Sequence, residues 1–343
     1  MANLTPTNLK VAQAKLQGKF ASNEMRLISA NTYLEIIKLT QFMLPNYMEL
    51  RTREDRAIEA SLLTRTKRAV VTGRTHDHTG DRGDSSTITP TWSTSADKFS
   101  MSLKQYDNNT YSMQEGLNNL FENAYLNVIE SLEDDAQDFI FGDRTGVDVS
   151  SGGGGTFDAT DDVYNFAAAD VDTIIQKTKT VMEENGYKGG LTVFADSIAY
   201  DKFRFQAAQG AGNDTNLAFQ YEGIKFVRSI GLASKFSGLV GTYATGVWIA
   251  VPNESIGALP WIPKQNREGK ETRLQTYSSG ISPYDGVPYA VHYYETKGDY
   301  SASNGMTQDE ATEMEISLDM SFVSSPITVT DETALFAFSL QAV

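Results

Sequence analysis

The longest uninterrupted amphipathic pattern in the chain, from Tyr111 to Phe141, constrains its fold more than any other feature. The stretch holds no proline, and Gly116 is its one internal glycine. Its apolar residues recur at steps of three and four, which places them on one stripe of an α-helix. They are Met113, Leu117, Leu120, Phe121, Ala124, Tyr125, Val128, Leu132, Ala136, Phe139 and Ile140. About thirty residues at ~1.5 Å each give a rod roughly 45 Å long, so we expect a scaffold helix, the spine, with Gly142 as a left-handed C-terminal cap.

The polar face of this spine is acidic. No lysine or arginine occurs between Lys104 and Arg144, and acidic residues gather near the C-terminal end of the helix. They include Glu130, Glu133, Asp134, Asp135 and Asp138. Acids are mildly unfavourable there because the helix dipole is already negative. Two interpretations remain open: a solvated acidic face, or a face covered by cations from elsewhere.

Length and charge limit the classes of function. A chain of 343 residues can bury a large core, and we expect two or three lobes. The 29 basic and 44 acidic residues give a net charge of −15, which argues against a protein that grips nucleic acid or anionic membrane. The absence of cysteine excludes disulfides. No apolar run approaches the ~20 residues that a helix needs to span a bilayer, and the N-terminus lacks the apolar core of a signal peptide. We therefore expect a soluble protein made in the cytoplasm.

The segments before the spine look like arms. Residues 7–31 and 32–44 have helical patterns, the second stopped by Pro45, but neither is long enough to fold alone. We expect them to pack on the same subunit or on a neighbour.

Residues 60–106 form a second arm with a basic outgoing strand. Its cations Arg65, Lys67, Arg68 and Arg74 lie in a run without acids between Ala60 and His76. The pattern predicts a strand near 62–73, a polar tip at 76–90 and a returning strand near 92–106. An isolated hairpin is marginal in water, so the arm must lie on another surface. Pairing of the basic strand with the acidic spine, within or between subunits, explains both charge patterns.

The segments after the spine predict an α/β lobe and returning strands. A glycine-rich linker, 143–162, precedes a helix capped by Asp170 and ended by Gly186, and a later helix capped by Asp196 or Ser197. The predicted lobe strands are 191–195, 223–229 and 246–252. Residues 298–310 are expected to form a surface turn. The strands 288–296, 313–323 and 333–340 are expected to return to the spine.

No pattern points to catalysis or to a metal. His76 and His78 lie in a polar loop and lack a third ligand at a recognised spacing. Arg82-Gly83-Asp84 matches an adhesion tripeptide only as three residues in that loop. The chain has no nucleophile elbow, zinc-protease motif, dinucleotide fingerprint or complete P-loop. We therefore predict no catalytic residues, no metal ligands and no cofactor, and a protein that is not an enzyme.

The order of these parts resembles the HK97-type major capsid protein of tailed bacteriophages over essentially the whole chain. Three passages carry local similarity: DVDTIIQKTKTVMEENGYKGGLTVFADSIAYDKF, GVWIAVPNESIGALP and DGVPYAVHYYE. The resemblance implies an α+β, HK97-like fold with an N-terminal arm, an extended E-loop hairpin, a P-domain with spine helix and antiparallel strands, and an α/β A-domain. The corresponding ranges are 1–58 for the N-terminal arm, 59–106 for the E-loop, 107–150 for the spine, 151–285 for the A-domain and 286–343 for returning P-domain strands.

The same resemblance implies pentamers and hexamers that form an icosahedral shell in the virion, around double-stranded phage DNA that the protein does not read by sequence. It implies separate scaffolding, portal and decoration proteins as partners, and no membrane. Some family members form lysine–asparagine cross-links; Lys67 and Lys98 lie in the expected E-loop, but no partner asparagine is identified. The expected intersubunit contacts are Arg65, Lys67, Arg68, Arg74, Glu130, Glu133, Asp134 and Asp138. The alternatives are an encapsulin-like compartment and a soluble α/β enzyme or binding protein.

Overall fold

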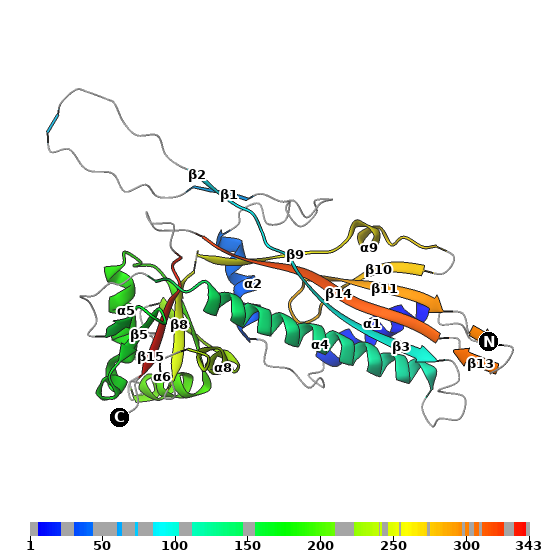
Figure 1. Cartoon of the computed structure of the whole chain (residues 1–343), viewed down its shortest axis with the longest axis horizontal. Helices are drawn as coiled ribbons and strands as arrows, with labels where there is room; N and C mark the ends of the chain where they lie inside the picture. Colours follow the sequence, from blue (N-terminus) through cyan, green and yellow to red (C-terminus); the bar gives the residue numbers. More distant parts are fainter. Residues whose placement is uncertain are drawn as a thin grey trace.

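The computed structural model describes residues 6–21, 31–43, 60–63, 73–74, 85–102, 112–146, 155–209, 223–239, 241, 246–253, 255–272, 275–296, 299–301, 305–308, 311–325 and 333–340. The protein is elongated: an α/β lobe lies at one end, and a long helix beside a twisted sheet extends from it (Figure 1). The fold is mixed α+β, with antiparallel and mixed sheets.

The spine is α4, Met113–Gly142. Ser112 caps its N-terminus in a reciprocal pair with Glu115, and the buried stripe follows the predicted apolar positions. The expected left-handed cap at Gly142 is wrong. The helix includes Gly142, and Asp143 follows with φ −89° and donates its N–H to the Phe139 carbonyl. Arg144 Nη1 donates to the Phe141 carbonyl at 2.7 Å, so the helix end is satisfied without a left-handed residue.

A five-stranded antiparallel sheet packs on the spine. Its longest strand, β14 (Ala311–Ser324), lies between β3 (Ser93–Ser102) and β11 (Pro288–Thr296). The outer strand β10 (Gln275–Ile281) pairs with β11, while β9 (Ile256–Trp261) pairs with the far end of β14. The predicted alternation is confirmed, because Met314, Ile316, Leu318 and Met320 are all buried in the core shared with the spine.

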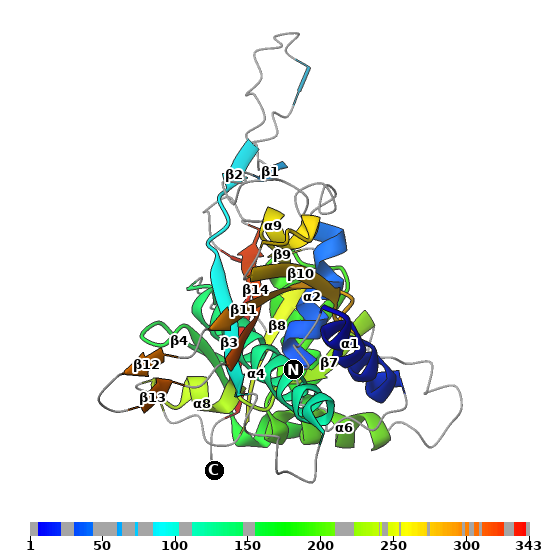
Figure 2. The ribbon, with the colours of Figure 1, turned by 90° about the vertical axis from the view of Figure 1, so that its right-hand side faces the viewer.

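The returning strand of the basic arm differs from the prediction. β3 pairs with β14 from Ser93 to Ser102 and so belongs to the five-stranded sheet. Within the described part of this arm, β1 (Ala60–Leu63) and β2 (Ser85–Ile88) pair with each other as a hairpin. The alternation that marked residues 92–106 as a strand was correct, but it fits a half-buried sheet position as well as an arm. The described hairpin projects beyond the body in both views (Figures 1 and 2).

The lobe holds a six-stranded sheet in the order β4-β5-β15-β8-β6-β7. Its strands are β4 (Thr156–Asp158), β5 (Val163–Phe166), β6 (Leu191–Ala195), β7 (Ile224–Arg228), β8 (Val247–Pro252) and β15 (Phe336–Leu340). The predicted strands 191–195, 223–229 and 246–252 are confirmed. The final strand does not return to the spine as expected, because β15 lies between β5 and β8. The end of the glycine-rich linker forms β4.

Helices cover both faces of the lobe sheet. A short 3-10 helix (Ala168–Thr173), α5 (Ile174–Glu184) and α6 (Ser197–Gln209) line one side, where Trp248 of β8 donates to the Thr178 hydroxyl. α8 (Leu232–Phe236) lies on the side that faces the spine. Asp196 caps α6 as predicted, accepting from Ala199 N at 2.7 Å. Asp170 does not cap a helix; it lies inside the 3-10 helix and pairs with Lys177.

The remaining described elements are α1 (Pro6–Ala21), α2 (Asn31–Met43), α9 (Lys264–Glu268) and the hairpin β12 (Asp299–Ser301) with β13 (Gly305–Gln308). The strands β12 and β13 form in the segment where only a surface turn was expected. α1 and α2 confirm the predicted helical segments, and both pack on their own spine. None of the described helices combines the length and apolarity needed to cross a bilayer.

Candidate functional site

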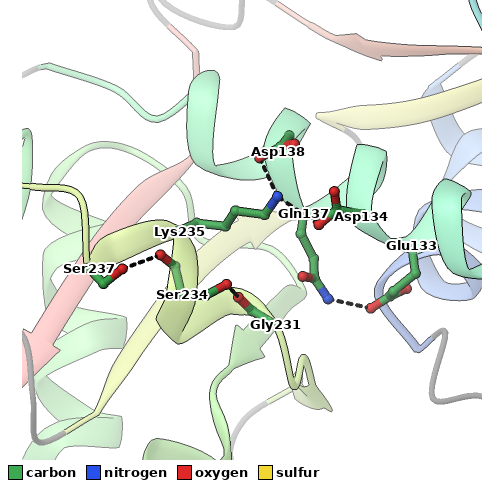
Figure 3. A network of polar contacts seen from close by, with 8 residues as sticks. All are labelled: Glu133, Asp134, Gln137, Asp138, Gly231, Ser234, Lys235 and Ser237. Atoms are coloured by element: carbon green, nitrogen blue, oxygen red, sulfur yellow. Dashed lines mark hydrogen bonds and ion pairs between the residues drawn. The ribbon is translucent and has the colours of Figure 1, made fainter.

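Three parts of the chain meet at the C-terminal half of α4, and we call this place the spine junction. The parts are the N-terminus of α2, the lobe segment from Arg228 to Ser237, and α4 from Glu133 to Asp138. Figure 3 shows the polar side of this junction, with α8 facing the spine. The junction fixes how the lobe and α2 are positioned on the spine.

Glu133 caps α2 from another helix. Its carboxylate accepts from the backbone N–H groups of Thr32 at 3.3 Å and Tyr33 at 2.8 Å. These groups lie in the first turn of α2, where N–H groups have no partner within the helix. A negative charge at this end also complements the positive pole of the helix. Glu133 is only 7% exposed, so this contact is a buried cap.

Burial shapes the titration of the two carboxyl groups that hold α2. Burial raises the pKa of Glu133, while its bonds from Tyr33 and Thr32 lower it in part. Asp285 accepts from the Tyr33 hydroxyl at 2.6 Å, and burial raises its pKa too. Both groups therefore favour the neutral form more than a solvated carboxyl does.

Lys235 of α8 joins the lobe to two acids of the spine. Its Nζ lies 2.7 Å from Asp134 Oδ1 and 2.6 Å from Asp138 Oδ1. Burial lowers the pKa of Lys235, but the bonds and charges of the two aspartates outweigh this and raise it overall. Beside this ion pair, Phe236 contacts Phe141 edge to face at 5.1 Å between centroids. α8 is thus held by charged contacts of Lys235 and by the buried apolar side chains of Leu232 and Phe236.

Gln137 connects these two sets of contacts. Its Nε2 donates to Glu133 Oε1 at 2.8 Å, one helical turn away (Figure 3). Its side chain lies against Gly231, where an added Cβ would overlap Gln137 Oε1. Gly231 therefore allows the start of α8 to approach the spine closely, and no larger residue fits without displacing the amide.

α2 also binds the lobe and the sheet directly. Thr32 Oγ1 donates to Ser229 Oγ at 2.8 Å, and Glu35 pairs with Lys225 of β7. Farther along, Thr40 Oγ1 accepts from Ala258 N of β9 at 2.7 Å. One helix thus contacts the spine, the lobe and the five-stranded sheet of the same subunit.

The structure places the predicted contact residues as follows. Arg65, Lys67 and Arg68 lie outside the described residues, and Arg74 is exposed. Glu130 is exposed, Glu133 is buried at the junction, and Asp134 and Asp138 pair with Lys235. Cations of the same chain thus cover part of the acidic face, since Lys19 also pairs with Glu122. An intersubunit role for these residues stays a prediction.

Sequence reasoning missed Gln137, Gly231 and Lys235. The sequence does hold a signal for Gln137. Glu133 and Gln137 are polar residues one helical turn apart, and they interrupt the apolar stripe between Leu132 and Ile140. Polar residues on a buried stripe need partners. The five residues of α8 are too few for a periodic pattern to appear.

The described residues show little that resembles a catalytic or metal site. Within them, no group of three or more histidine or acidic side chains could hold a metal ion. A cavity of about 510 Å³ lies on the five-stranded sheet, lined in part by Lys98, His292 and Glu315. His292 stacks on Tyr277 with ring centroids 4.6 Å apart, and Lys98 pairs with Glu315. These are cross-strand neighbours on an open sheet face.

Comparison with known proteins gives matches only among solved structures. No protein family matches the sequence, and no curated protein does either. The chain is similar to the capsid asymmetric unit of cyanophage Pam1, at 12% identity and a TM-score of 0.48, over 92% of this chain and 93% of that one. A structure from Mycobacterium phage Adephagia matches at 12% identity and a TM-score of 0.49, over 90% of each chain. The mature capsid of bacteriophage PhiM1 matches at 12% identity and 0.42, over 83% and 82%.

These structural neighbours are phage structures, and several are capsids. At such identities and TM-scores the similarity carries no argument about what the chain does.

Proposed function

We propose that this chain is a major capsid protein that assembles into pentamers and hexamers of an icosahedral shell around phage double-stranded DNA. The observation that carries the proposal is the projecting hairpin. β1 and β2 pair with each other in four-residue strands and belong to neither of the two larger sheets. A two-stranded hairpin of this size is marginal in water. A surface on another copy would supply the packing that it lacks.

The shape and charge of the rest of the protein are compatible with a subunit of a shell. The spine and the five-stranded sheet form an extended slab, and the lobe is attached at one end (Figure 1). Projecting arms shared between neighbours build large interfaces from modest bodies. A net charge of −15 suits a shell that does not adhere to the DNA it encloses.

In this proposal the subdomains follow the expected ranges with three changes. β3 leaves the E-loop range, and β9 and β10 leave the A-domain range, because all three belong with the spine and its sheet. β15 belongs with the α/β lobe instead of the returning strands. The described part of the N-terminal arm, 1–58, consists of α1 and α2, which pack on their own spine. The projecting hairpin of β1 and β2 in the E-loop range is the part proposed to reach a neighbour.

The proposed contacts between copies join opposite charges. Arg65, Lys67, Arg68 and Arg74 continue from the hairpin and would face acids of a neighbouring spine. Glu130 is exposed, and the side chains of Asp134 and Asp138 are 66% and 58% exposed despite their pairing with Lys235. Glu133 is already used inside the subunit, so it would act only indirectly.

Size-exclusion chromatography followed by negative-stain microscopy tests the proposal. The expected result is capsomers or closed shells from the purified chain. A stable monomer of 37.7 kDa would contradict it and would favour a soluble enzyme or binding protein. The contents of purified shells separate the remaining alternative: DNA supports the phage capsid, and a cargo enzyme supports an encapsulin-like compartment.

A further inference from the structure

The spine junction brings α2 and the lobe into contact with two adjacent turns of α4. Glu133 holds the start of α2, and Lys235 of α8 is held by Asp134 and Asp138. Gln137 lies between them and touches both sides (Figure 3). We infer that Glu133 and Gln137 form a relay, so that docking of α2 on the spine determines how firmly α8 and the lobe are held.

The first step of the relay is electrostatic. When α2 is docked, two backbone N–H groups compensate the buried charge of Glu133. If α2 leaves, the bond from Gln137 is the one that this charge keeps among the described residues. A buried carboxylate without donors is costly, so Glu133 must then turn toward water or take a proton. Either response changes the acceptor on which Gln137 depends.

The second step is steric. The Gln137 amide fills the space beside Gly231, and even a Cβ there would overlap its oxygen. The orientation of this amide is fixed by its bond to Glu133. A Gln137 side chain that loses this bond can turn into the space that Gly231 occupies. It would then push the start of α8 away from the spine and strain the contacts of Lys235 and Phe236.

α2 also contacts the lobe segment directly, without the relay. Thr32 of α2 donates to Ser229, and Asn31 Nδ2 donates to the Arg228 carbonyl, two and three residues before Gly231. The lobe segment that leads into α8 is therefore positioned by α2 as well as by the spine. The two routes act in the same direction, and a test must separate them.

Amide hydrogen exchange of the purified full-length chain provides that test, because exchange reports local opening of each segment. Glu133→Gln keeps the side-chain shape but weakens the cap of α2. We expect faster exchange at the Thr32 and Tyr33 amides, and exchange on the order of three- to tenfold faster at the Ser234 and Ser237 amides of the α8 segment. Light scattering confirms that all variants are compared in one assembly state.

Gln137→Met is the matched control, since methionine has a similar length and cannot bond Glu133. In this background Glu133→Gln should still loosen α2 but should change α8 exchange less, because the contacts of Thr32 and Asn31 with the lobe segment are then the remaining route. If α8 exchange does not respond to Glu133→Gln, or responds equally in the Gln137→Met background, the relay is wrong.

A variant on the lobe side tests the reverse direction, because coupling between two sites is reciprocal. Gly231→Ala should displace the Gln137 amide and speed exchange at Thr32 and Tyr33. Gly238→Ala is its control, because an added Cβ there meets nothing closer than 4.0 Å. Equal exchange at Thr32 and Tyr33 in the two alanine variants would also overturn the inference.

Discussion

At the scale of single residues, Glu133 carries a role that its neighbour Glu130 does not. Removing the Glu133 carboxylate leaves two N–H groups of α2 without their acceptor at a buried site. We expect Glu133→Ala to lower the free energy of unfolding by about 1–3 kcal/mol. Glu130→Ala, on an exposed turn of the same helix, should stay within about 0.5 kcal/mol of the native chain. Urea denaturation of both variants measures the difference, and equal losses would show that the cap contributes nothing.

The same carboxyl group predicts a pH dependence. Burial raises the pKa of Glu133 above its ordinary value of 4.5, so the folded chain binds this proton more tightly than the unfolded chain. Its contribution to stability is therefore largest at low pH and falls as pH rises from 4.5 through the raised pKa. We expect the unfolding free energy to decline less steeply over this range in Glu133→Gln. An unchanged slope in urea titrations at several pH values would contradict the assignment.

At the scale of elements, α8 holds the lobe with few residues. Phe236 is 1% exposed and packs on Phe141 of the spine. Phe236→Ala should cost about 3–5 kcal/mol through the cavity it leaves. Phe205→Ala, on the lobe helix α6 with 62% exposure, should cost less than about 0.5 kcal/mol. Thermal unfolding of the two variants checks this, and a small loss for Phe236→Ala would show that α8 does not anchor the lobe.

Sequence periodicity predicted the elements whose pattern is long. The spine and β14 were found because their apolar residues follow periods of 3.6 and 2 over many positions. Of the candidate contacts, Asp134 and Asp138 were recognised as acids on an open helix face. Their partner, Lys235, was not, because contact between residues about 100 positions apart leaves no local pattern.

The pairing partner of a strand was harder to predict than the strand itself. β15 is buried along its whole length, and a continuous apolar run does not show which sheet contains it. Chain order suggested the spine, but β15 pairs with β5 and β8 in the lobe. β3 was likewise recognised as a strand and assigned to the wrong partner. In both cases long-range pairing decided the position.

At the scale of the whole molecule, the charge of the arm predicts an effect on assembly. Reversing Arg65, Lys67 and Arg68 together to glutamate should impair assembly at physiological salt, while the monomer still folds. Single reversals should have little effect, because exposed ion pairs contribute only ~0–1 kcal/mol each. Reversing Lys10, Lys188 and Lys270, which are exposed elsewhere, is the control of equal charge. Sedimentation velocity measures assembly, and normal assembly of the arm variant would refute the electrostatic contact.

The proposed assembly depends most on where the hairpin of β1 and β2 lies when copies of the chain meet. Cryo-electron microscopy of the purified assemblies measures this directly. We expect density for the hairpin on the surface of a neighbouring copy, with its basic continuation near acidic side chains. Assemblies in which every hairpin lies on its own subunit, or a chain that forms none, would contradict it.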